Sequence, residues 1–202
     1  MLIIKLAMVA IMLIVWFYFY DKLPDQIPVH RNYLWQADNY GSKRQWLLML
    51  PVLNLVLVLL MTFLPMNMPK MQTSQVNSKA WELMQLWIVW FFMYIYFVSI
   101  YATLNPEVSI NKFMRIWLWA FFVVLWNYLG KIRQNYWVWI KVPWTYLSEE
   151  VRDKTNRLWW RIFVWWWIIF MLWGIFGLTE TILSVWIFLL VILAIVFVPI
   201  IY

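Results

Sequence analysis

The chain has 202 residues, of which 66% are apolar and 12% are charged, and its formal net charge at pH 7 is +7. Soluble domains are usually about 45–50% apolar and about 25% charged, so a soluble fold could not bury this much apolar surface. The absence of cysteine excludes disulfides, thiol nucleophiles and thiolate metal sites. The excess apolar surface has to face lipid, and the positive charge indicates basic cytoplasmic loops rather than direct nucleic-acid binding.

Six apolar runs follow one another along the chain, each about as long as a helix needs to cross ~30 Å of hydrocarbon. They are residues 2–20, 46–66, 83–104, 113–130, 159–177 and 182–202. None of them alternates like a barrel strand, and an unpaired strand cannot satisfy its backbone in lipid. The sequence therefore predicts an all-α integral membrane protein with six transmembrane helices.

The basic residues around these runs predict the orientation. Ten of the 16 Lys and Arg residues, Lys5 among them, belong to the N-terminal side and to the second and fourth loops. Cytoplasmic loops are enriched in Lys and Arg, so both termini are expected in the cytoplasm. Residues 21–45 then face outward and residues 131–158 face the cytoplasm. The expected organisation is a two-span unit at 1–66, a linker at 67–79 and a four-span unit at 80–202.

The first loop, residues 21–45, is predicted to be an ordered connector without helix. Pro24 and Pro28 prevent a regular helix at its start, and the sequence "NYGS" at 39–42 is a turn signal. His30 is the single histidine. It is interpreted either as a ligand or pH sensor, or as a surface residue bonded to its own loop. One histidine without any cysteine argues against a metal site.

The first loop also carries a recognisable pattern. The stretches "LPDQIPVH" and "ADNYGSK", followed by a run that contains Pro51, resemble the N-terminal domain of unknown function found in the Sdp immunity protein family, the SdpI-type membrane proteins. The matching residues are Leu23, Pro24, Ile27, Pro28, His30, Asp38, Tyr40, Gly41, Ser42 and Lys43. Trp35 stands where the family has glycine.

The fourth loop, residues 131–158, predicts a helix that leads into the fifth run. Pro143 breaks any helix that leaves the fourth run, and Ser148 is a favourable N-cap followed by two glutamates in the first turn. Two acid-to-base pairs then have the i,i+4 spacing of helical ion pairs. They are Glu150 with Lys154 and Asp153 with Arg157. Taken alone, this pattern indicates a basic loop with an amphipathic lead-in helix that starts near residue 149.

The same region resembles a second signature of the Sdp immunity family. The matches are Asn127, Tyr128, Lys131, Asn135, Tyr136, Ile140, Pro143, Trp144, Thr145, Ser148, Val151, Lys154, Thr155 and Arg157. Three positions depart from the family pattern: Lys141 replaces arginine, Val142 replaces threonine and Asn156 replaces histidine. These departures argue against a role that needs a bidentate guanidinium or a titrating imidazole at those positions.

Tryptophan is unusually frequent in this chain. There are 19 tryptophans and four glycines, although glycine is common in membrane spans. Interfacial anchoring does not explain the "WWW" at 165–167, which lies inside the fifth run. Trp35, Trp126 and Trp139 fall on family glycine positions. We hypothesise that these positions are glycine in the cell, because some bacterial lineages read UGA as glycine; the alternative is a lineage with aromatic-rich spans.

The sequence points to binding rather than catalysis. It has no GxSxG, no HExxH and no phosphate-binding glycine loop, so neither an enzyme nor a cofactor is expected. The resemblance implies an immunity protein of the bacterial plasma membrane that protects against a secreted antimicrobial peptide. It also implies that the protein senses this peptide and recruits a cytoplasmic repressor. A small carrier or channel, or a structural membrane protein of unknown role, are the alternatives. Lipid, peptide toxin and repressor are the expected partners, and the oligomeric state is left open.

Overall fold

The structure is a computed structural model that describes residues 1–32, 36–63, 79–129, 143–176, 186–187, 189–190 and 193. By its internal contacts the chain separates into two compact units. The first unit holds Met1–Pro69 with Gln85–Met114, and the second holds Lys70–Met84 with Arg115–Tyr202. The first unit therefore takes in residues from both sides of the 67–79 segment.

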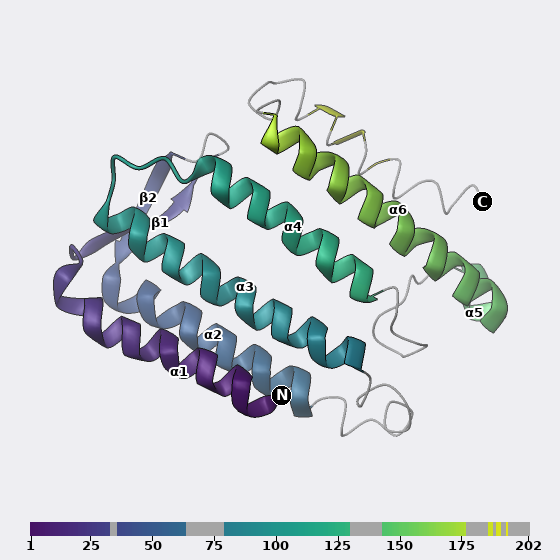
Figure 1. Ribbon diagram of the computed structural model, residues 1–202, viewed down its shortest axis with the longest axis horizontal. Coiled ribbons are helices and arrows are strands. Elements are labelled where there is room, and N and C mark those ends of the chain that lie inside the picture. The colour runs from purple at the N-terminus through teal and green to yellow at the C-terminus, as the bar shows by residue number, and fades with distance from the viewer. Residues whose placement is uncertain are drawn as a thin grey trace. The chain divides into compact units, whose positions relative to one another are not determined.

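Three long apolar helices make up most of the first unit (Figure 1). They are α1 (Leu2–Phe19), α2 (Lys43–Phe63) and α3 (Lys79–Leu104). Of the described residues, these stretches are the ones long and apolar enough to cross a membrane. Only 22% of the most apolar stretch of α1 and of α2 is buried, so most of their surface is left for lipid. As far as the structure describes them, the predicted runs at 2–20, 46–66 and 83–104 are confirmed as long apolar helices.

Two clusters of buried side chains hold the first unit together. The first contains Met12, Leu23, Ile27, Leu47, Tyr96 and Ile100, and the second contains Met8, Val9, Val58 and Val89. Asn54 of α2 is also fully buried, and its Nδ2 donates a hydrogen bond of 3.1 Å to the carbonyl of Val89 in α3. Packing and such hydrogen bonds join helices in lipid, where the hydrophobic effect between helices is absent.

Lys5 departs from its predicted place as a flanking charge. The residue is only 4% exposed, and its Nζ donates hydrogen bonds to Gln85 Oε1 and, at 3.3 Å, to Thr62 Oγ1. A buried ammonium needs oxygen acceptors to offset its lost hydration, and these two side chains supply them. The contact links α1, α2 and α3. Lys5 therefore takes part in packing the three helices. Its charge is weaker evidence for a cytoplasmic N-terminus than its position in the sequence suggested.

A β-hairpin follows α1, and it corrects the expectation of a purely helical chain. After the 3₁₀ turn η1 (Tyr20–Lys22), β1 (Gln26–Arg31) pairs antiparallel with β2 (Ala37–Ser42). The two prolines do exclude a helix here, as predicted. The turn prediction at 39–42 is wrong, because these residues lie inside β2 and Gly41 pairs with Ile27. Pairing with β1, rather than the turn propensity of residues 39–42, determines the conformation of these residues.

The second unit contains α4 (Asn111–Leu129) from Arg115 onward, α5 (Pro143–Leu147) and α6 (Glu149–Ile175). Aromatic rings pack α4 against α6: the ring centroids of Phe122 and Trp167 are 4.2 Å apart, and those of Trp126 and Phe163 are 4.1 Å apart. α4 contains a shorter apolar stretch, Phe113–Tyr128. The predicted sixth run, 182–202, lies largely outside the described residues, so the six-span arrangement and its orientation stay predictions.

Several indole N–H groups are buried without a hydrogen-bond acceptor. The Nε1–H groups of Trp126, Trp167 and Trp173 have no partner within the described part of the chain. A buried indole N–H normally finds an acceptor, and leaving it unpaired costs free energy. Trp126 is also one of the positions where the family has glycine. Trp167 and Trp173 are orphaned without being among the positions named above, so this observation does not distinguish recoding from an aromatic-rich lineage.

Candidate functional site

The two family-motif segments lie in different units. The outer-loop motif forms the β-hairpin of the first unit, and the 131–158 motif leads into α6 of the second unit. Part of the second motif, Lys131, Asn135 and Lys141, lies outside the described residues, as does the side chain of Trp144. The hairpin is therefore the motif that the structure describes most completely.

One half of the hairpin motif holds the hairpin on the helices. Leu23 and Ile27 are buried in the first cluster of the core. Lys43, at the start of α2, donates from Nζ to the carbonyl of Leu23 at 2.9 Å and forms an ion pair of 3.1 Å with Asp25. Gly41 lies under the indole of Trp46, and a Cβ added there would overlap that ring. Packing and bonding within the first unit therefore explain why these motif positions carry these residue types.

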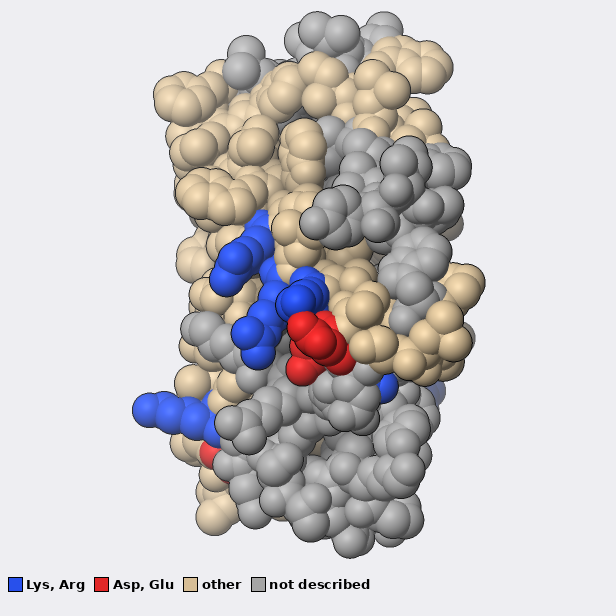
Figure 2. Space-filling view, turned by 90° about the vertical axis from the view of Figure 1, so that its right-hand side faces the viewer, with Lys and Arg blue, Asp and Glu red and all other residues tan. Residues whose placement is uncertain are grey.

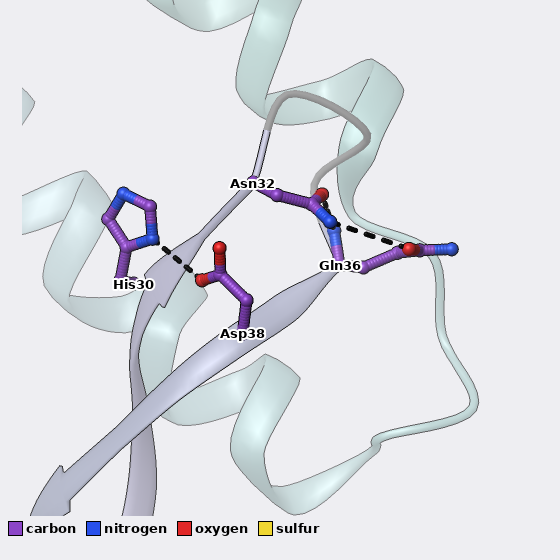
Figure 3. Close-up of polar contacts among 4 residues, drawn as sticks. All are labelled: His30, Asn32, Gln36 and Asp38. Atoms are coloured by element: carbon purple, nitrogen blue, oxygen red, sulfur yellow. Dashed lines mark hydrogen bonds and ion pairs between the residues drawn. The ribbon is translucent and has the colours of Figure 1, made fainter.

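The other half of the motif is exposed. His30 Nδ1 and Asp38 Oδ1 are 2.6 Å apart, and their side chains are 65% and 41% exposed (Figure 3). Pro28 pairs with Tyr40 in the same hairpin, and Tyr40 is 56% exposed. None of these four side chains is buried in the core clusters of the first unit. The structure thus brings together motif residues that are eight or more positions apart and leaves them accessible.

Polar bonds between two facing residues hold the loop end of the hairpin together. The backbone N–H of Asn32 donates to the carbonyl of Gln36 at 3.0 Å, and the backbone N–H of Gln36 donates to Asn32 Oδ1 at 3.0 Å. The side-chain amide of Asn32 also reaches Gln36 Oε1 at 3.5 Å (Figure 3). These bonds hold the strand ends that position His30 and Asp38.

The His30–Asp38 contact fixes the direction of the imidazole. An ionised carboxylate can only accept hydrogen bonds, so Nδ1 of His30 carries the donated proton. The other ring nitrogen, Nε2, then points away from Asp38 (Figure 3). This arrangement presents an oriented imidazole nitrogen, a carboxylate and a phenol on one exposed hairpin. Within the described residues, no group of three or more His, Asp or Glu side chains could hold a metal ion. The arrangement is suited to recognising a polar partner.

The predicted start of α6 is confirmed. Ser148 Oγ accepts from the backbone N–H of Val151 at 3.4 Å, and the Ser148 carbonyl accepts from the N–H of Arg152 at 3.0 Å. Lys154 Nζ lies 2.7 Å from Glu150 Oε1, and this hydrogen bond together with the charge of Lys154 lowers the pKa of Glu150. α6 continues from Glu149 to Ile175 without a break, as expected for a lead-in helix that enters the fifth run.

The remaining motif residues are divided between buried and exposed positions. Thr145 of α5 is fully buried, whereas Asn127 of α4 and Arg157 of α6 are exposed and Thr155 is half-buried. The ion pair between Asp153 and Arg157 stays a prediction, which the i,i+4 spacing of the two residues in α6 permits.

Comparison with known protein families gives two matches. Residues 7–55 match a domain of unknown function, DUF1648, and residues 131–202 match the SdpI/YfhL protein family. The first match covers the hairpin and much of α1 and α2, and the second covers α5 and α6. Asn127 lies outside both. No match was found among curated proteins or among solved structures. The resemblance drawn from the two sequence motifs is thereby confirmed.

Proposed function

Because this chain carries a DUF1648 domain followed by an SdpI/YfhL family domain, we propose that it protects a bacterial plasma membrane against a secreted antimicrobial peptide. At the level of the family it is a membrane protein of the immunity type. The finer proposal is that the exposed face of the hairpin, with His30, Asp38 and Tyr40, contacts the peptide. On the predicted topology this face lies outside the cell, where a secreted peptide arrives.

The observation that supports this proposal is the exposed His30–Asp38 pair. Ile27, Gly41 and Lys43 of the same motif are explained by packing and by bonds to the loop. His30 and Asp38 are not, because an exposed contact between two polar side chains contributes little to stability. Exposed polar residues on a loop that a rigid scaffold positions are suited to binding. A protein that works by binding needs no catalytic residues.

A cytoplasmic repressor is the second proposed partner. It would be recruited by the 131–158 segment, which carries Trp144 and lies on the cytoplasmic side in the predicted topology. The family resemblance supports this part of the proposal. Recruitment would follow if peptide binding at the hairpin changed the state of this segment.

The carrier alternative has less support. A carrier needs polar side chains in succession along its spans. In the first unit, Lys5 instead donates to Gln85 and Thr62, and Asn54 donates to the backbone of α3. These groups are used in holding helices together, which favours a static bundle over a path for a solute.

Survival of toxin-exposed cells tests the proposal. Cells sensitive to a membrane-active peptide of the Sdp type would express the chain, His30→Gln, Asp38→Asn or the control Asn39→Ser. Asn39 is exposed, adjoins Asp38 and is not among the residues that match the family pattern, so the control should protect as the parent does. We expect each of the other two variants to lower survival at unchanged protein level. Full protection by both would contradict the hairpin as the contact surface.

The same assay separates the recoding question from the function. Each variant would also be built with Trp35→Gly, Trp126→Gly and Trp139→Gly. If neither form of the parent chain protects against any peptide of this class, the immunity proposal fails. The fold description would then still stand, and the carrier or structural alternatives would gain weight.

A further inference from the structure

One face of α6 changes from cationic to apolar along its length. Lys154, Arg157, Arg161, Trp165 and Leu172 are all exposed. At 3.6 residues per turn these five side chains fall within about 80° of the helix circumference, so they form a single stripe. Trp165 is 67% exposed, whereas Trp159, Trp160 and Phe170 are buried on other sides of the helix.

The position of the change fits a helix that leaves the headgroup layer and enters hydrocarbon. The last cation of the stripe, Arg161, is followed one turn later by Trp165, which is about 6 Å further along the axis. Lys and Arg near the ends of a span reach the headgroups, tryptophan gathers at the membrane interface, and aliphatic side chains face the acyl chains. Along α6 the stripe likewise has cations first, then a tryptophan and then an aliphatic side chain.

Two of the cations are available for an outside partner. Arg157 and Arg161 are exposed, whereas Lys154 is bonded to Glu150. Figure 2 shows Lys and Arg side chains gathered beside Asp and Glu side chains on the side where α5 and the start of α6 lie. The guanidinium fork matches phosphate oxygens in a bidentate manner.

We propose that Arg157 and Arg161 bind the phosphate of an anionic glycerophospholipid whose acyl chains lie along Trp165 and Leu172. The two arginines are one turn apart, about 6 Å along the axis, so both can reach one phosphate. A soluble phosphate would neutralise the arginines but leave the apolar part of the stripe uncovered. A lipid would neutralise the arginines with its phosphate and cover the apolar part of the stripe with its acyl chains. The site is independent of which side of the membrane α6 starts from.

Native mass spectrometry of the full chain, purified in detergent and titrated with lipid, tests this site. The probes are phosphatidylglycerol, phosphatidylcholine with the same acyl chains, and glycerol phosphate without acyl chains. We expect phosphatidylglycerol to bind in preference to phosphatidylcholine. Each arginine near an anionic surface strengthens binding about fivefold, so Arg157→Gln with Arg161→Gln should weaken phosphatidylglycerol binding by about 25-fold. Replacement of both by lysine should keep much of the preference.

Arg44→Gln is the control for the loss of an exposed arginine outside the site, because Arg44 is an exposed arginine at the start of α2 in the first unit. The control should bind phosphatidylglycerol as the parent does. Equal binding of the two lipids, an unchanged preference in the double glutamine variant, or an equal loss in Arg44→Gln would each overturn the proposal. Binding of glycerol phosphate as strong as that of the lipid would assign the arginines to a soluble phosphate. Lost peptide protection with unchanged lipid binding would assign them to a protein partner.

Discussion

Gly41→Ala tests why the hairpin motif contains a glycine. An alanine Cβ at this position would overlap the indole of Trp46 and would lie 2.9 Å from Cγ1 of Val29. The backbone of Gly41 is not in the left-handed region, so the requirement is one of space rather than of conformation. Trp46 and Val29 both pack against the first core cluster. The added methyl group must therefore push a packed indole or lift the hairpin from the helices.

The expected cost is that of overpacking a filled site, about 1–3 kcal/mol. The upper part of this range is favoured because the obstructing atoms belong to a rigid ring rather than to the end of a flexible chain. Unfolding by denaturant in detergent micelles, followed by circular dichroism, measures the change in free energy.

A double-mutant cycle with Trp46→Ala isolates the contact. Removal of the indole takes away the closest obstructing atoms and leaves only the approach to Val29 Cγ1, so Gly41→Ala should then cost clearly less than in the parent chain. The coupling energy between the two sites should reach at least ~1 kcal/mol, as is usual for residues in contact. If Gly41→Ala costs the same with and without the indole, or costs nothing in the parent chain, the steric explanation is refuted.

Two further predictions concern the second unit. Ser148→Ala should destabilise the first turn of α6 by about 0.5–1 kcal/mol, because the N-cap acceptor for Val151 is lost; Ser148→Asp should not. Faster amide hydrogen exchange at residues 149–152 in the alanine variant alone would confirm this, and equal rates in both variants would contradict it. If Trp126 and the other family-glycine positions are recoded, the intact mass of the native protein will be lower than that of the written sequence. The deficit will be the mass difference between tryptophan and glycine at each exchanged position, and a mass equal to that of the written sequence rules recoding out there.

The sequence by itself determined the features that depend on neighbouring residues. The apolar runs at 2–20, 46–66 and 83–104 required helices because their length and backbone chemistry leave few other solutions in lipid. Ser148 and the following glutamates placed the start of α6, since capping is a local interaction. The family motifs could be found for the same reason, because their residues follow one another at fixed spacing.

Only the tertiary structure decided which distant residues meet. The hairpin register is irregular between Pro28 and His30 and again between His30 and Arg31, so the distance from His30 to Asp38 could not be read from their spacing. Lys5 is buried because Thr62 and Gln85, far along the chain, supply its acceptors. The exposed stripe of α6 became visible only once its other sides were seen to be packed. Contacts of this kind depend on how whole helices and strands pack and pair, and a local pattern of residues does not determine this packing.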